Sequence, residues 1–266
     1  YTHSMTYGDI DRDGDIDVFL GNLTAPWISG ATAGPMILLN NGAGQFTADP
    51  SRLPNHLFSS QTGYTGSVLA DTDNDGDLDL VLGAFQDGLA SRILVNDGTG
   101  RFSEGATLPP RPNPTREADA VTDILATDLN GDGRVDLIMN VAGDGYRLAH
   151  IQVLINYEGG FADETASRML VMPTVADETV RWRVPNKLKL VDVNGDGHLD
   201  IVATSGTFTP VMLNDGMGRF ISLPENWGMT NFQQIAPGDF NGDGVIDFLI
   251  WHATHNGAEH LRVVYG

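Results

Sequence analysis

The sequence of 266 residues contains no cysteine, so no disulfide framework can be expected and no cysteine pairing bears on the cellular compartment. Its seven histidines do not cluster at the spacing of zinc ligands, which argues against a zinc site. No run of about 20 apolar residues occurs, so we predict no membrane-spanning helix. The 15 lysines and arginines form no basic stripe, which argues against a nucleic-acid partner.

Familiar catalytic motifs are missing as well. The sequence has no G-x-S-x-G elbow, no H-E-x-x-H motif and no phosphate-binding loop. We therefore assign no catalytic residue, and we expect a non-enzymatic protein. Helical patterning is nearly absent, while 32 glycines and 13 prolines interrupt the chain often, which favours short strands joined by turns.

Acidic residues are abundant, and they are concentrated in one repeated motif. The formal net charge is -20, and nineteen of the 35 Asp and Glu residues lie in five nonapeptides. These span residues 9–17, 71–79, 128–136, 192–200 and 239–247. The acids outside them nearly balance the basic residues, so the charge excess belongs to the repeated motif.

The nonapeptides share one pattern of oxygen-bearing side chains. Positions 1, 5 and 9 are always Asp, position 3 is Asp or Asn, position 6 is Gly and position 8 is aliphatic. Position 7 varies. A loop of this kind can surround Ca²⁺ with side-chain oxygens from positions 1, 3 and 5 and a backbone carbonyl from position 7, while Gly permits the sharp turn. The Asp at position 9 can close the shell. Mg²⁺ fits less well, because it keeps several water ligands.

Two other interpretations of the motif are weaker. Asp, Asn and Gly also form ordinary turns, but a turn needs only one or two of them, and the pattern returns five times. An EF-hand requires Glu at position 12 and flanking helices. Position 12 is instead Leu20, Leu82, Met139, Ala203 or Ile250, within apolar runs typical of strands.

A second motif follows the first four nonapeptides. Strand-like residues lead into a turn such as 96–102, Asn-Asp-Gly-Thr-Gly-Arg-Phe, and the third copy, from Asn156 to Phe161, is one residue shorter. Successive nonapeptides begin 62, 57, 64 and 47 residues apart. One unit therefore consists of a strand, the acidic loop, a strand, a connection, a strand, a tight turn and a strand.

Four antiparallel strands in a unit that repeats along the chain are typical of a propeller blade. We predict an all-β fold: a β-propeller of four-stranded antiparallel blades, with five repeats visible. The single domain spans 1–266, with repeats at about 1–62, 63–120, 121–184, 185–230 and 231–266. The last unit lacks a fourth strand. Five units could close alone, or they could belong to a six- or seven-bladed ring.

The nonapeptides and the Asn-x-Gly-x-Gly-x-Phe turns resemble the FG-GAP/VCBS repeats of integrin-α-like propellers, over essentially the whole chain. The resemblance implies about five calcium ions, each in the hairpin between the first two strands of a blade. It also implies an extracellular, secreted or cell-surface setting and a binding or adhesion role. The implied ligands, positions 1, 3, 5, 7 and 9 in turn, are Asp9, Asp11, Asp13, Asp15 and Asp17; Asp71, Asp73, Asp75, Asp77 and Asp79; Asp128, Asn130, Asp132, Arg134 and Asp136; Asp192, Asn194, Asp196, His198 and Asp200; and Asp239, Asn241, Asp243, Val245 and Asp247.

The ligand of the whole protein is less defined. Aromatic, Arg and His residues gather in connections expected on the face opposite the acidic loops, where they suit a glycan or an extracellular protein. These residues are Trp27, Tyr146, Arg147, His150, Arg181, Trp182, Arg183, Trp227, His252, His255 and His260. The alternative is a carbohydrate-active enzyme, similar to a polysaccharide lyase, that uses Arg, His and Tyr from that face. The chain begins at Tyr1 without Met, which fits a processed or trimmed segment of a larger multidomain chain.

Overall fold

A computed structural model gives the fold. It describes residues 2–22, 34–58, 63–85, 89–110, 120–143, 148–170, 187–204, 211–222, 234–253 and 259–266. Nineteen strands form five separate antiparallel sheets within these residues. Helical structure is limited to η1 (Pro50–Arg52), η2 (Asn55–Phe58) and α1 (Thr165–Arg168). None of the described helices is long and apolar enough to cross a membrane.

Each sheet is a meander of strands that follow one another in the chain. The first contains β1 (Thr2–Gly8), β2 (Asp17–Asn22), β3 (Met36–Asn40) and β4 (Phe46–Ala48). The second contains β5 (Tyr64–Ala70), β6 (Asp79–Ala84), β7 (Arg92–Asn96) and β8 (Phe102–Thr107). The third contains β9 (Ala120–Thr127), β10 (Asp136–Gly143), β11 (Leu148–Tyr157) and β12 (Gly160–Asp163).

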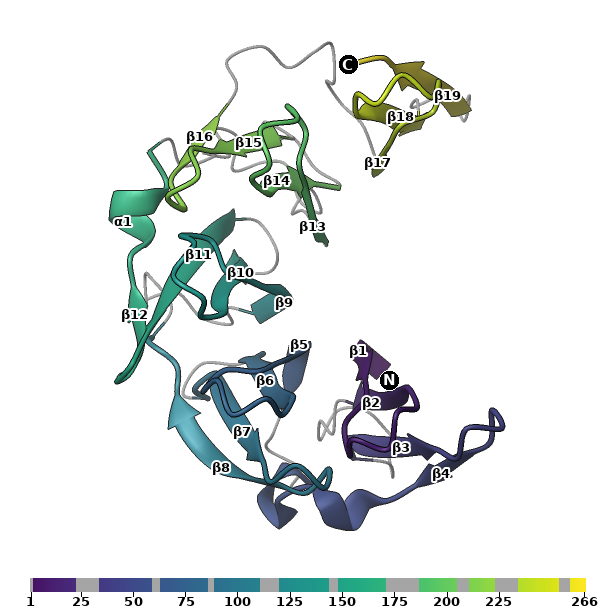
Figure 1. Cartoon of the computed structure of the whole chain (residues 1–266), viewed down its shortest axis with the longest axis vertical. Helices are drawn as coiled ribbons and strands as arrows, with labels where there is room; N and C mark the ends of the chain where they lie inside the picture. The colour runs from purple at the N-terminus through teal and green to yellow at the C-terminus, as the bar shows by residue number, and fades with distance from the viewer. Residues whose placement is uncertain are drawn as a thin grey trace.

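The fourth sheet contains β13 (Leu188–Val191), β14 (Asp200–Ala203), β15 (Val211–Asn214) and β16 (Phe220–Ser222). The fifth has three strands, β17 (Gln234–Gly238), β18 (Asp247–Ala253) and β19 (Glu259–Val264). The predicted all-β architecture of four-stranded antiparallel units is thus confirmed, with a last unit of three strands. In Figure 1 the sheets follow one another around an open arc, and the first strand of each sheet lies toward its inner side.

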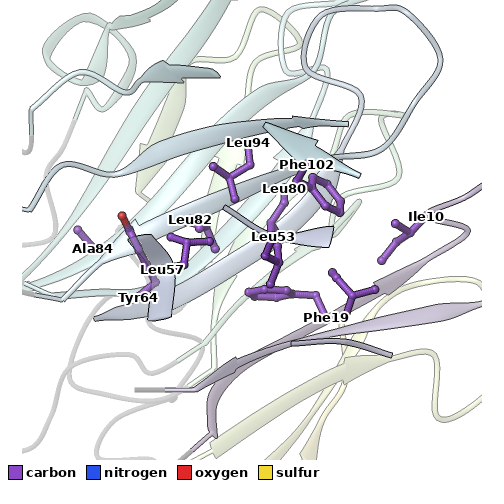
Figure 2. Close-up of a cluster of buried hydrophobic side chains, with 11 residues drawn as sticks. Ile10, Phe19, Leu53, Leu57, Tyr64, Leu80, Leu82, Ala84, Leu94 and Phe102 are labelled. Carbon is purple, nitrogen blue, oxygen red and sulfur yellow. The ribbon is translucent and has the colours of Figure 1, made fainter. Parts of the chain in front are cut away.

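The hydrophobic core is divided into layers between consecutive sheets. Strand side chains alternate between the two faces of a sheet, so each sheet contributes to two layers. In β6, Leu80 and Leu82 pack against the first sheet, while Val81 packs against the third. Figure 2 shows the first layer, where Phe19 of β2 and Ile10 of the first acidic loop meet Leu80 and other residues of the second sheet. Four such layers join the five sheets.

The phenylalanine after a tight turn faces the preceding sheet wherever the described chain has one. Phe102 belongs to the layer between the first and second sheets, and Phe220 to the layer between the third and fourth. Phe161 packs beside the layer between the second and third. Phe46 belongs to the first sheet, which has no preceding sheet in the described chain, and it is 49% exposed. The same sheet leaves Tyr7 69% exposed.

Candidate metal centres in the acidic hairpins

Each nonapeptide connects the first two strands of its sheet, and the Asp at position 9 begins the second strand. This carboxylate is completely buried in all five copies. In the third copy, Asp136 accepts hydrogen bonds from the backbone N–H of Leu129, at 3.0 Å, and of Asn156, at 2.8 Å. The same two bonds, from position 2 and from the Asn at or next to the end of the third strand, are found in each of the first four copies. In the fifth, Gly266 takes the place of the missing Asn.

The position-9 carboxylate therefore joins the acidic loop to the third strand of its own sheet. Burial raises the pKa of Asp79, Asp136 and Asp200. The hydrogen bonds that these carboxylates accept act in the opposite direction and lower the pKa in part. The same Asn adds a second bond between the third strand and the acidic loop through its side-chain amide. Asn96 donates from its side chain to the carbonyl of Leu78, at 3.1 Å, in its own loop.

Positions 1 and 5 organise the turn. The carboxylate at position 1 accepts the N–H of the glycine at position 6 in every copy, at 2.8–3.1 Å. The carboxylate at position 5 accepts the N–H of position 7, at 2.8–2.9 Å. The glycine at position 6 has φ between 85° and 92°, which explains why no other residue occupies it. Position 4 is also left-handed, with φ of 61° at Arg12 and 62° at Asn74, and glycine in the other copies.

The first two loops bring three carboxylates together. Asp9, Asp11 and Asp17 each offer an oxygen within 4.8 Å of the others, and Asp71, Asp73 and Asp75 do the same. The Oδ1 atoms of Asp9, Asp11 and Asp71 are buried without a hydrogen-bond partner. Burial, and then neighbouring carboxylates, raise the pKa of Asp11 and Asp73. A group of hard oxygen donors with unsatisfied buried atoms fits a divalent cation such as Ca²⁺.

The last three loops satisfy their oxygens internally. The side-chain amide of the Asn at position 3 donates to the carboxylate at position 5, at 3.3 Å for Asn130 and 2.9 Å for Asn194 and Asn241. Oδ1 of the position-1 Asp accepts two further backbone N–H groups. Backbone hydrogen bonds lower the pKa of Asp239. Although all five loops are described, no comparable group of three carboxylates forms in these three. Their donor types still suit a hard cation.

Side chains at position 7 cover the tight turn of the same sheet. A Cβ on Gly42, Gly98 or Gly216 would lie 2.5–2.7 Å from the side chain of Asp15, Asp77 or His198 respectively, so the glycine leaves room for it. Arg134 donates from Nε to the carbonyl of Asn156, at 3.1 Å. The sequence showed only that position 7 varies, and the structure shows that its side chain contacts the tight turn.

Neighbouring acidic loops are joined across the sheets. Asn96 donates to the carbonyl of Ile10 in the preceding loop at 2.8 Å, and Asn156 donates to Thr72 at 2.8 Å in the same way. Arg12 forms an ion pair with Asp77. Sequence reasoning missed these contacts between units, although the recurring Asn at one place in four turns was a visible signal.

The comparisons with known proteins decide the family. A profile of the FG-GAP-like repeat matches residues 9–82 and 192–250, which together make up half of the chain. The chain belongs to the FG-GAP-like repeat family. The matched ranges contain all of the acidic loops except the third, which carries the same position-1, -5 and -9 aspartates.

Two curated relatives align with 47% of this FG-GAP-like repeat chain. Both are named T-cell immunomodulatory protein homolog: one from Plasmodium falciparum (isolate 3D7), 30% identical, and one from Plasmodium yoelii yoelii, 26% identical. The aligned part spans only 18% and 19% of their respective lengths.

Two solved structures share the fold. An Agrocybe aegerita lectin that recognises non-reducing terminal N-acetylglucosamine matches 99% of this chain and 66% of its own, with a TM-score of 0.54 and 20% identity. The exotype rhamnogalacturonan lyase YesX matches 98% of this chain and 47% of its own, with a TM-score of 0.52 and 18% identity. These likenesses establish the fold of the FG-GAP-like repeat chain and nothing finer.

The described structure also contains a His, Arg and Tyr cluster. Arg92 donates from Nη1 to Oε2 of Glu104 at 2.9 Å, and His56 Nδ1 lies 3.2 Å from Oε1 of the same carboxylate. Nearby, the buried hydroxyl of Tyr64 has no hydrogen-bond partner, and burial raises its pKa. Several residues predicted for the opposite face lie outside the described residues: Trp27, Tyr146, Arg147, Arg181, Trp182, Arg183, Trp227 and His255. His150, His252 and His260 lie in β11, β18 and β19.

Proposed function

We propose that this FG-GAP-like repeat chain is a calcium-stabilised, extracellular binding module that holds a glycan or a protein ligand. The observation that carries the proposal is the cluster of three carboxylates in each of the first two loops, where buried oxygens lack hydrogen-bond partners. A bound divalent cation would supply those partners and offset the repulsion between the carboxylates. About five ions, one for each loop, would cancel about half of the net charge of -20.

The extracellular setting follows from the proposed ions. Loops built from one short nonapeptide offer few ligands beyond it, which suits the weak sites of extracellular modules that fill at the calcium concentrations outside cells. FG-GAP-like repeats are typical of extracellular proteins, which is in keeping with this location. Rigid sheets that present loops on one side also suit ligand binding, since the scaffold fixes the loops without using them for the core.

Calcium titration tests the proposal. We expect isothermal calorimetry of the calcium-free chain to count up to five sites, and we expect millimolar calcium to raise the thermal midpoint. An ion at about 100 times its Kd adds about 2.7 kcal/mol per site to the free energy of unfolding. If millimolar calcium produces neither a heat of binding nor a shift of the midpoint, the calcium part of the proposal is wrong.

Ligand retention tests the binding role. The chain, with calcium present, is applied to a glycan array and to immobilised extracellular proteins, and we expect retention without a change in the ligand. The second candidate, a lyase-like carbohydrate-active enzyme, is favoured by the cluster of His56, Arg92, Glu104 and Tyr64. It predicts release of unsaturated ends from a polysaccharide panel, lost in His56→Ala and Arg92→Ala. Release of such ends would replace the binding role with the enzymatic one.

A further inference from the structure

The first three acidic loops are connected by hydrogen bonds that cross from one sheet to the next. The side-chain amide of Asn96, the last residue of β7, donates to the carbonyl of Ile10 in the first loop, at 2.8 Å, and to that of Leu78 in the second, at 3.1 Å. The amide of Asn156, in β11, connects the second and third loops in the same way, at 2.8 Å and 3.1 Å. Each amide therefore uses both of its N–H donors to hold two successive loops.

The residue at position 4 adds a second connection, toward the following loop. Arg12 of the first loop donates to the carbonyl of Asp75 in the second, at 3.4 Å, and forms an ion pair with Asp77. Asn74 of the second loop donates to the carbonyl of Gly133 in the third, at 3.3 Å. Both donors have a left-handed backbone, which is unfavourable for a residue with a side chain. The chain accepts this conformation at the two places where the side chain reaches the next loop.

The fourth and fifth loops have no such connections among the described residues. Position 4 is glycine in the last three loops, and a Cβ on any of these glycines would meet no atom within 4 Å. In the described chain, the side-chain amide of Asn214, the counterpart of Asn96, donates only within its own loop, to the carbonyl of Leu199 at 3.2 Å. In the fifth sheet, Gly266 takes the place of this Asn. The five loops therefore divide into a linked group of three and two separate loops.

These connections end on parts of the loops that an ion would order. They reach backbone carbonyls at positions 2, 5, 6 and 8, which lie at or between the positions whose oxygens suit a cation. When one loop closes around its ion, these carbonyls become fixed, and the connections hold the facing part of the next loop in place. The next loop then loses less conformational entropy when it closes, so the two binding events favour each other. Such coupling is reciprocal along the row of loops.

We propose that the first three acidic loops bind calcium cooperatively, whereas the fourth and fifth bind it independently. The inference rests on the calcium binding proposed above, and it adds how the sites influence one another. The buried oxygens that lack partners, Oδ1 of Asp9, Asp11 and Asp71, all belong to the linked group. The charge of a bound ion opposes binding of the next, but physiological salt screens charges beyond about 8 Å.

The test follows each loop separately by NMR. The N–H of the position-6 glycine donates to the position-1 carboxylate in every loop, so its amide signal should move when that loop takes up an ion. Calcium chloride is titrated into the calcium-free chain at about 0.15 M ionic strength. We expect the signals of Gly14, Gly76 and Gly133 to move together, with a Hill coefficient of about 2, and those of Gly197 and Gly244 to follow single-site curves.

A double variant separates the first loop from the second. Arg12→Gly with Asn96→Ala removes the connections described above between these two loops, and it gives position 4 the glycine of the last three. The matched control is Arg101→Ala with Asn214→Ala, which also removes an exposed arginine and a turn amide but no connection between loops. Asn96 and Asn214 each accept two glycine N–H groups, so both turns lose the same bonds.

In the double variant, the Gly14 signal should follow a single-site curve with its calcium midpoint raised about fivefold, while Gly76 and Gly133 still move together. The control should keep all three together, and equal thermal midpoints in saturating calcium show that both variants fold. Single-site curves for the first three loops of the wild type, or a double variant in which Gly14 still moves with Gly76, overturn this inference and leave the proposed calcium binding intact. If no glycine signal moves at millimolar calcium, both are overturned.

Discussion

The first two acidic hairpins and the last three have the same five key positions, but they balance their carboxylates differently. With Asp at position 3, the first two gather three carboxylates and leave oxygens buried without partners. With Asn at position 3, the side-chain amide in each of the last three loops donates a hydrogen bond to the position-5 carboxylate. The first class leaves buried oxygens that a bound cation would satisfy, whereas the other reaches the same turn through its own hydrogen bonds. At position 3, an amide in place of a carboxylate distinguishes them.

The largest expected effect concerns position 9, which both classes share. Asp79→Ala in the first class and Asp200→Ala in the second should each lower the free energy of unfolding by about 2 to 6 kcal/mol, because two buried N–H groups lose their acceptor. Urea unfolding in saturating calcium measures both. A loss confined to one class would show that position 9 does not serve the two classes alike.

A smaller effect is expected when the position-3 residue of one class is replaced by that of the other. Without calcium, Asp11→Asn combined with Asp73→Asn should raise the free energy of unfolding on the order of 1–2 kcal/mol, because each change removes one crowded carboxylate. In calcium the sign should reverse, since an ion ligand is weakened. The converse pair, Asn194→Asp with Asn241→Asp, serves as the control and should lower stability in chelator. If both pairs behave identically in chelator, position 3 does not distinguish the loops.

The backbone at position 4 is left-handed in both classes, but only the first class carries a side chain there. Gly195 has φ of 73°, and a Cβ there would meet no atom within 4 Å, so only backbone strain opposes a side chain. Gly195→Ala should cost about 1 kcal/mol of unfolding free energy. Gly195→Asn should cost less, because Asn74 adopts this conformation at the matching place. Thermal unfolding compares the two variants, and equal losses would argue against a conformational origin.

The smallest effect lies in the ion pair between the first two loops. Arg12 is half-exposed where it meets Asp77, so the pair should add only about 0.5 kcal/mol. A double-mutant cycle of Arg12→Gln and Asp77→Asn measures that coupling, which should vanish in 1 M salt. A coupling that persists in high salt would indicate a buried interaction in place of a surface pair.

Local sequence patterns predicted the fold because the strands and turns of each unit are determined by residues within that unit. The acidic nonapeptides and the Asn-Gly turns predicted the hairpins, the antiparallel sheets and the missing last strand. Contacts between units could not be predicted, since Asn96 and Ile10 are 86 residues apart in the chain. The periodicity of a strand shows which residues share a face but not which sheet that face meets.

The candidate site was predicted in part. Sequence reasoning selected the oxygen-bearing positions, and their role as calcium ligands stays a prediction. It did not predict that the position-9 carboxylate would use both oxygens for backbone N–H groups, because that depends on where the third strand ends. Nor did it find the pocket of about 370 Å³ between the second and third sheets, although it noticed the shorter third turn that lines this pocket.

The phenylalanine that follows each tight turn gives the row of sheets a direction. Phe102 and Phe220 each reach back to the sheet before their own, and Phe46 has no such sheet to reach. A duplicated four-stranded unit would therefore carry its own phenylalanine for the layer that joins it to the preceding unit.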